Sequence, residues 1–181
     1  PQSVGMAAGQ VDFAVAVFLN AASPTDLAGL SWLALKASAG VASVVGLPQA
    51  SVGASRLLVE LNQVVGLDAR FDADSRVIDF AADQGSRVLA VSTGVGRSIA
   101  LDFNGDRGAL TRFGGAFSLR IGDFVEIAGE FGFERSIRDF TLADGSALRA
   151  QVLILSGDSL GGFVGAGPYR VDRDGDGVVE T

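Results

Sequence analysis

A strict period-two alternation of apolar and polar residues, interrupted by glycine, constrains this chain more than any other feature. The alternation is clearest in the segment 117–133, FSLRIGDFVEIAGEFGF, where Asp123 beside Gly122 marks a turn. Successive side chains of a strand point to opposite faces of its sheet, so the pattern predicts two strands with one buried face. We expect the core to contain the apolar residues at its odd positions: Phe117, Leu119, Ile121, Val125, Ile127, Phe131 and Phe133.

The same alternation predicts further strands along the chain. They are expected at 11–19, 57–61, 77–80, 88–103 and 148–155. The segment 24–46 is ambiguous, because Leu27, Leu30 and Leu33 also fit the apolar stripe of a helix capped by Thr25 or Asp26. A helix at 25–36 is therefore the alternative to a strand there.

Glycine sets the expected architecture. The chain has 25 glycines and four prolines, and the glycines fall between apolar runs, where turns and bulges occur. The segments LKASAGVASVVGL, FSLRIGDFVEIAGEF and LILSGDSLGGFVG share a loose pattern. Such self-similarity predicts an all-β fold of glycine-rich stacked β units, solenoid-like, with a β-sandwich as the alternative. The length of 181 residues fits one β-rich module, 1–181.

Composition excludes several function classes. A net charge of −7 disfavours nucleic acid as a partner, and no apolar run approaches the roughly 18 residues of a membrane-spanning helix. The chain has no His to activate the serine of GDSLG at 157–161. Glu126, Glu130 and Glu134 resemble a glycosidase carboxylate set, but solvated strand residues are the better interpretation. We expect no enzymatic activity.

The strongest motif is the acidic stretch VDRDGDGVVET at 171–181. Ca²⁺ takes six to eight oxygen ligands, and alternate carboxylates around a glycine turn supply them. Gly177 occupies the turn position, and the twelfth ligand position of such a loop would fall beyond Thr181. The predicted ligands are Asp172, Asp174, Asp176, the backbone carbonyl of Val178, and Glu180.

Four strings, in order, carry a resemblance. LALKASAGVASVVGL, ASRLLVELN, FSLRIGDFVEIAGEFGFE and GGFVGAGPYRVDRDGDGVVE together resemble the long tandem repeats of giant secreted bacterial calcium-binding, adhesin-like surface proteins. In those repeats a segment similar to FVGAGPYRVDRDGDGVVE precedes one similar to VGMAAGQVDFAVAVFL, which is 4–19 in this chain. The resemblance implies β-rich repeats, a cell-surface or extracellular-matrix location, and a calcium loop at 171–181 that joins neighbouring modules.

These observations favour a structural or adhesive extracellular module. We expect calcium to stabilise it and neighbouring copies to assemble head to tail into a fibre, rod or surface layer. The alternative is a non-catalytic polysaccharide-binding domain of a secreted enzyme.

Overall fold

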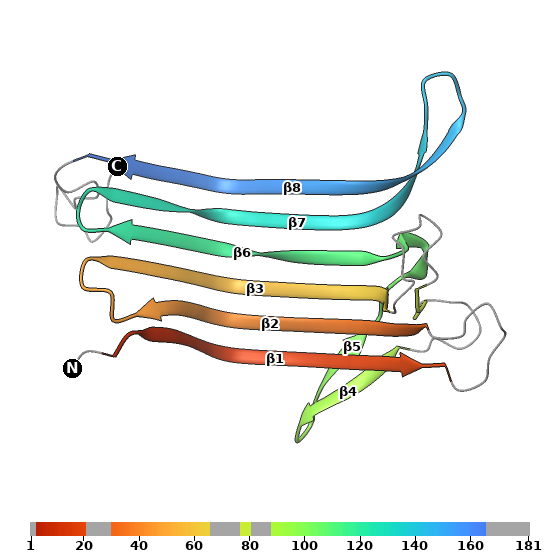
Figure 1. Cartoon of the computed structure of the whole chain (residues 1–181), viewed down its shortest axis with the longest axis horizontal. Coiled ribbons are helices and arrows are strands. Elements are labelled where there is room, and N and C mark those ends of the chain that lie inside the picture. The colour runs from red at the N-terminus through yellow and green to blue at the C-terminus, as the bar shows by residue number, and fades with distance from the viewer. Residues whose placement is uncertain (1–2, 21–29, 66–76, 81–87, 166–181) are drawn as a thin grey trace.

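The computed structural model describes residues 3–20, 30–65, 77–80 and 88–165. Its main element is one antiparallel sheet with the strand order β1-β2-β3-β6-β7-β8 (Figure 1). The six strands are β1 Gly5–Leu19, β2 Ser31–Val45, β3 Ala50–Val65, β6 Leu110–Ile121, β7 Val125–Thr141 and β8 Ala147–Val164. A separate hairpin consists of β4 Leu89–Gly94 and β5 Arg97–Leu101, and a 3-10 turn, η2 Gly105–Arg107, follows it.

The all-β prediction is confirmed. The segments 11–19, 57–61 and 148–155 lie inside β1, β3 and β8, and 117–133 spans the β6–β7 hairpin with its turn at 122–124. Apart from the β4–β5 hairpin, the described strands lie side by side in one open sheet, and they show neither a solenoid coil nor a second large sheet packed against the first.

Three local predictions are wrong in their described parts. The helix at 25–36 is strand from Ser31 onward, because β2 pairs along its length with both β1 and β3. The single strand expected at 88–103 is a hairpin, since Gly96 adopts a φ of 71° at the turn and folds β5 back onto β4. The segment 77–80 is no strand either, although the Phe80 N–H donates to the Phe103 carbonyl at 2.9 Å.

The buried core lies on one face of the sheet, here called the covered face. Ala14 of β1 and Ala34 of β2 are almost fully buried there, and their small side chains leave room for larger ones from the second layer. Phe80 and Phe103 pack edge to face, with ring centroids 6.1 Å apart. The core cluster consists of Ala14, Ala34, Phe80, Leu101, Phe103 and Leu110.

The opposite face, here called the open face, is apolar and exposed, which makes the predicted core wrong. The register places the seven predicted core residues on this one face of β6 and β7, but none of them is buried. Phe131 is 43% exposed and Ile127 45%. Alternation tells which side chains share a face, whereas the second layer decides which face is covered. Here β4, β5 and Phe80 cover the other one.

A line of three left-handed residues and three glycines, here called the crease, crosses all six strands. Gln10 in β1, Arg56 in β3 and Ser159 in β8 have φ values of 55°, 52° and 52°, which L-residues rarely adopt. Arg56 and Ser159 lie where β3 and β8 contain one residue more than the neighbouring strand, as in a β-bulge. The register places glycines beside them: Gly40, Gly115 and Gly129.

The crease requires glycine because the neighbouring strand approaches closely. A Cβ atom on Gly129 would lie 3.1 Å from Leu160 Cα, and one on Gly115 would lie 3.0 Å from the Ser55 carbonyl oxygen. Both neighbours are backbone atoms, which cannot rotate away as a flexible side chain can. In Figure 1, β1 and β8 change direction near this line, as bulged strands do.

We predict that Gly129→Ala destabilises the protein by about 1–3 kcal/mol, because the added methyl group overpacks the β7–β8 contact. Gly161→Ala is the matched control in β8, since a Cβ there meets nothing within 4 Å. Urea unfolding followed by circular dichroism measures both variants. Equal midpoints for the two variants would contradict the packing described here.

Candidate functional site: the charged row and the open face

The predicted calcium ligands Asp172, Asp174, Asp176, Val178 and Glu180 lie outside the described residues, so their site stays a prediction. Within the described ranges, no three His, Cys, Asp or Glu side chains come close enough together to hold a metal ion. The described part of the chain instead presents two features at the sheet itself. One is a row of charges on the covered face, and the other is the open face with its two edge strands.

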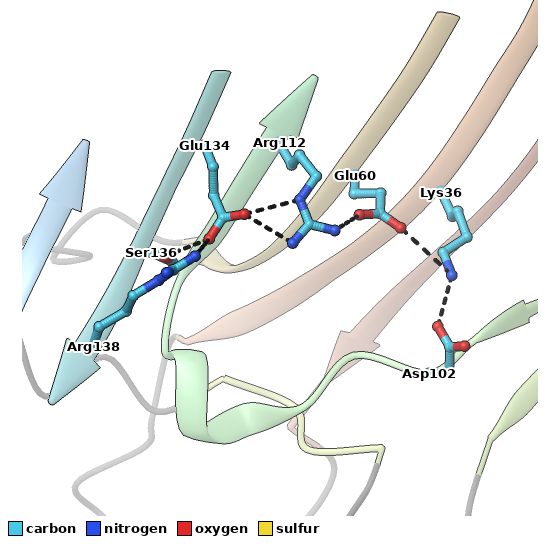
Figure 2. A network of polar contacts seen from close by, with 7 residues as sticks. All are labelled: Lys36, Glu60, Asp102, Arg112, Glu134, Ser136 and Arg138. Carbon is cyan, nitrogen blue, oxygen red and sulfur yellow. Dashed lines mark hydrogen bonds and ion pairs between the residues drawn. The ribbon is translucent and has the colours of Figure 1, made fainter. Parts of the chain in front are cut away.

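The charged row crosses four neighbouring strands with alternating sign. The register pairs Lys36 of β2 with Glu60 of β3, Glu60 with Arg112 of β6, and Arg112 with Glu134 of β7. Arg112 donates to Glu60 at 2.7 Å and to Glu134 at 2.8 and 3.0 Å, while Lys36 Nζ lies 3.5 Å from Glu60 (Figure 2). The two inner charges, Glu60 and Arg112, thus each lie between charges of opposite sign on the adjacent strands.

Both ends of the row have further partners. Lys36 Nζ donates at 2.6 Å to Asp102, which follows β5, and so ties the second layer to the sheet (Figure 2). At the other end, Arg138 and Ser136 each donate to Glu134 at 2.8 Å. Lys36 Nζ also lies 5.6 Å from the centre of the Phe103 ring. The row therefore connects the polar contacts of the sheet to the aromatic core.

The carboxylates of the row are the least exposed of its charged groups. The side chains of Glu60 and Glu134 are 10% and 12% exposed, against 31% for Arg112. Burial raises the pKa of Glu134, but hydrogen bonds from Arg138, Ser136 and Arg112 outweigh it and lower the pKa to about 2. Glu134 is thus ionised at neutral pH and unsuited to donate a proton as a general acid.

The other glutamates of β7 have arginine partners too. Arg120 donates to Glu126 at 3.0 Å, and Arg56, at the crease, donates to Glu130. Glu126, Glu130 and Glu134 do share a face of β7, as the alternation predicts, but each is bound by a guanidinium group. Ser159 of GDSLG lies in the crease and donates to Asp158 at 3.2 Å, so its described partner is the carboxylate of the preceding residue.

The open face presents many large, exposed apolar side chains close together. Phe113 and Phe133 stack with centroids 4.8 Å apart, and Phe117 meets Phe131 edge to face at 5.9 Å. Large exposed apolar residues from five of the six strands belong to it: Val11, Phe13, Val15, Val17, Val59, Phe113, Phe117, Ile121, Ile127, Phe131, Leu153 and Leu155. Exposed apolar patches of this extent are typical of interaction surfaces.

Two long edge strands border both faces. Among the described strands, β1 and β8 each have a neighbour on one side only. They contain 15 and 18 residues, whereas edge strands that avoid association are often very short. The edges thus offer unpaired backbone groups to a further strand.

Sequence reasoning missed the charged row. Lys36 and Glu60 are single charges inside apolar runs, a signal visible in the sequence, whereas Glu134 is followed directly by Arg135. Which strand neighbours which, and in which register, decides that they meet, and neither can be inferred from alternation alone.

No protein-family model, no curated protein and no solved structure matches the chain. Over the described ranges, the structure contains no helix with the length and apolar character needed to cross a membrane.

We predict that Arg112→Met destabilises the protein by about 3 kcal/mol, because it leaves two largely buried carboxylates, Glu60 and Glu134, without the cation that they share. Arg149→Met is the control: its pair with Asp139 is exposed, so the expected loss is below about 1 kcal/mol. Chemical denaturation of both variants measures the difference. Similar losses would mean that the row contributes no more than a surface ion pair.

We also predict a specific acid sensitivity. The pKa of Glu134 is about 2 in the folded protein, below its ordinary value of 4.5, so its stabilising effect is complete above pH 4.5. That effect declines as the pH falls toward about 2, by at most about 3 kcal/mol. Denaturation midpoints between pH 7 and 2 should fall less for Glu134→Gln than for the natural chain. Parallel pH profiles would exclude Glu134 as the titrating group.

Proposed function

We propose that the chain is a non-catalytic structural module that assembles end to end with copies of itself on a cell surface or in an extracellular matrix. The observation that carries the proposal is the direction of the two edge strands. β1 begins and β8 ends at the same end of the sheet, and the two strands run antiparallel (Figure 1). A following copy can therefore continue the same up-and-down order of strands.

The alternating directions of the six strands support this arrangement. Because the number of strands in the sheet is even, the last strand runs opposite to the first. A chain that leaves β8 at Val164 is then at the correct end of the sheet to enter the β1 of a next copy. Copies added in this way produce a sheet that grows without closing, as head-to-tail contacts do. For such an array, the stacked, solenoid-like arrangement of the repeated β units stays a prediction.

Calcium has its proposed place between the copies. The acidic residues Asp172, Asp174 and Asp176 follow β8 in the sequence, and in the proposed array they would precede the entry to the next copy. A cation bound there would neutralise their mutual repulsion and shorten the connection. The module would then be stiffer with calcium than without it. An adhesive role, or the alternative role in polysaccharide binding, would use the exposed surfaces of the same array.

The test compares one module with two modules joined in tandem. We expect the tandem chain to melt at a higher temperature, because each interface between neighbours adds stability, and we expect the difference to shrink with a calcium chelator. Asp172→Ala and Asp174→Ala should weaken calcium binding strongly, whereas Asp102→Ala, distant in sequence, serves as the control. Identical melting of one and two modules would refute end-to-end assembly.

A further inference from the structure

We infer that β8 of one copy pairs with β1 of a second copy in a single, uninterrupted antiparallel register, in which residue numbers of the two strands add to 168. The inference rests on the proposed function, since it names the interface through which copies would join. The partner is a second copy of this chain and the surface is the outer edge of each end strand.

The register of the sheet itself gives the alignment. Rows of paired residues can be followed from β1 to β8 on either side of the crease. On one side the row is Met6, Val44, Val52, Leu119, Ile127 and Gly162. On the other side it is Phe13, Ala37, Val59, Phe113, Phe133 and Leu155. A copy displaced across the sheet without stagger therefore brings 6 opposite 162 and 13 opposite 155.

The sum of 168 is the same on both sides of the crease only because two bulges in the sheet compensate for each other. β3 has one extra residue relative to β6, between Ser55 and Leu58, and β8 has one extra relative to β7, opposite the step from Ala128 to Glu130. The two shifts have opposite effects on the alignment and cancel between β1 and β8. Had only one bulge been present, the two edges would agree on one side of the crease and be out of register on the other.

The crease also continues across the proposed interface. In this register Ser159, with its φ of 52°, lies opposite Gly9 of the next copy. Within the sheet, Gln10 and Arg56 likewise lie opposite a glycine, Gly40. At the proposed interface, as within the sheet, each left-handed residue thus lies opposite a glycine of the neighbouring strand.

Side chains match on both faces. On the open face, Leu155 lies opposite Phe13 and Leu153 opposite Val15, and all four are exposed in the single module, Leu155 by 75%. Such directly opposed apolar pairs stabilise antiparallel strands. On the covered face, Ile154 lies opposite Ala14. The charged residues Asp12, Arg149 and Asp158 face Ser156, Leu19 and Gln10, so no like charges oppose one another.

The β4–β5 hairpin supports the same placement. It contacts β1 and, in Figure 1, extends past the outer edge of that strand. Val95 at its tip is fully exposed. A β8 strand placed beside β1 would lie under this overhang and present Val152 and Ile154 on the covered face. The hairpin belongs to a different sheet, so within the described residues it adds no strand to the outer edge of β1.

The test uses disulfide trapping, which the natural chain permits because it contains no Cys. Phe13→Cys with Leu155→Cys, in one chain, should give intermolecular disulfides and a ladder of multimers on a non-reducing gel. Met6→Cys with Gly162→Cys tests the register on the other side of the crease. The matched controls shift one member by a residue, to Ile154→Cys or Gly161→Cys, and so place the two thiols on opposite faces.

We expect both matched pairs to give at least tenfold more multimer than their shifted controls at equal protein concentration. A ladder only from the pair at 13 and 155 would overturn the uninterrupted register. No register-specific ladder from either pair, or a strictly monomeric chain in sedimentation at all concentrations, would overturn edge pairing altogether. If the tandem chain nevertheless melts above the single module, end-to-end assembly stands and uses another surface, so the two proposals fail separately.

Discussion

The whole structure depends on one register that six strands share. In a sheet with chemically different faces, a slip by one residue moves every side chain of a strand to the wrong face. A slip of β6, for example, would place Arg112 among the phenylalanines of the open face and Phe113 between Glu60 and Glu134. The alternating charges on the covered face and the apolar residues on the open face therefore favour the same alignment of the strands.

The second layer depends on small residues at the right positions of that register. Ala14 and Ala34 are diagonal neighbours on the covered face, and there Phe80, Phe103 and Leu101 fill the space that larger strand residues would occupy. Lys36 lies two residues further along β2, on the same face of the sheet. Its Nζ donates a hydrogen bond to Asp102 and lies over the ring of Phe103. Apolar packing and the ion pairs thus hold the same hairpin against β1 and β2.

Sequence alone was informative about strands and uninformative about layers. The alternation in VDFAVAVFL and FSLRIGDFVEIAGEFGF correctly gave the strands and the sets of residues that share a face. It could not tell that Phe117 and Phe131 would be exposed, because burial depends on what packs against a face from elsewhere in the chain. The hairpin at Gly96 and the bulges at Arg56 and Ser159 were missed for a related reason. A glycine or a polar residue inside an apolar run is compatible with a turn, a bulge or a regular strand.

The crease has a mechanical consequence for a ribbon of copies. It crosses the strands, so in a ribbon that grows strand by strand it would run lengthwise, parallel to the growth axis. Six strands at a spacing of about 4.8 Å would add about 29 Å of ribbon per copy. A thin plate that is folded along its length resists bending far better than a flat plate of the same thickness. The backbone strain at Gln10, Arg56 and Ser159 would then contribute flexural stiffness to the assembly as a whole.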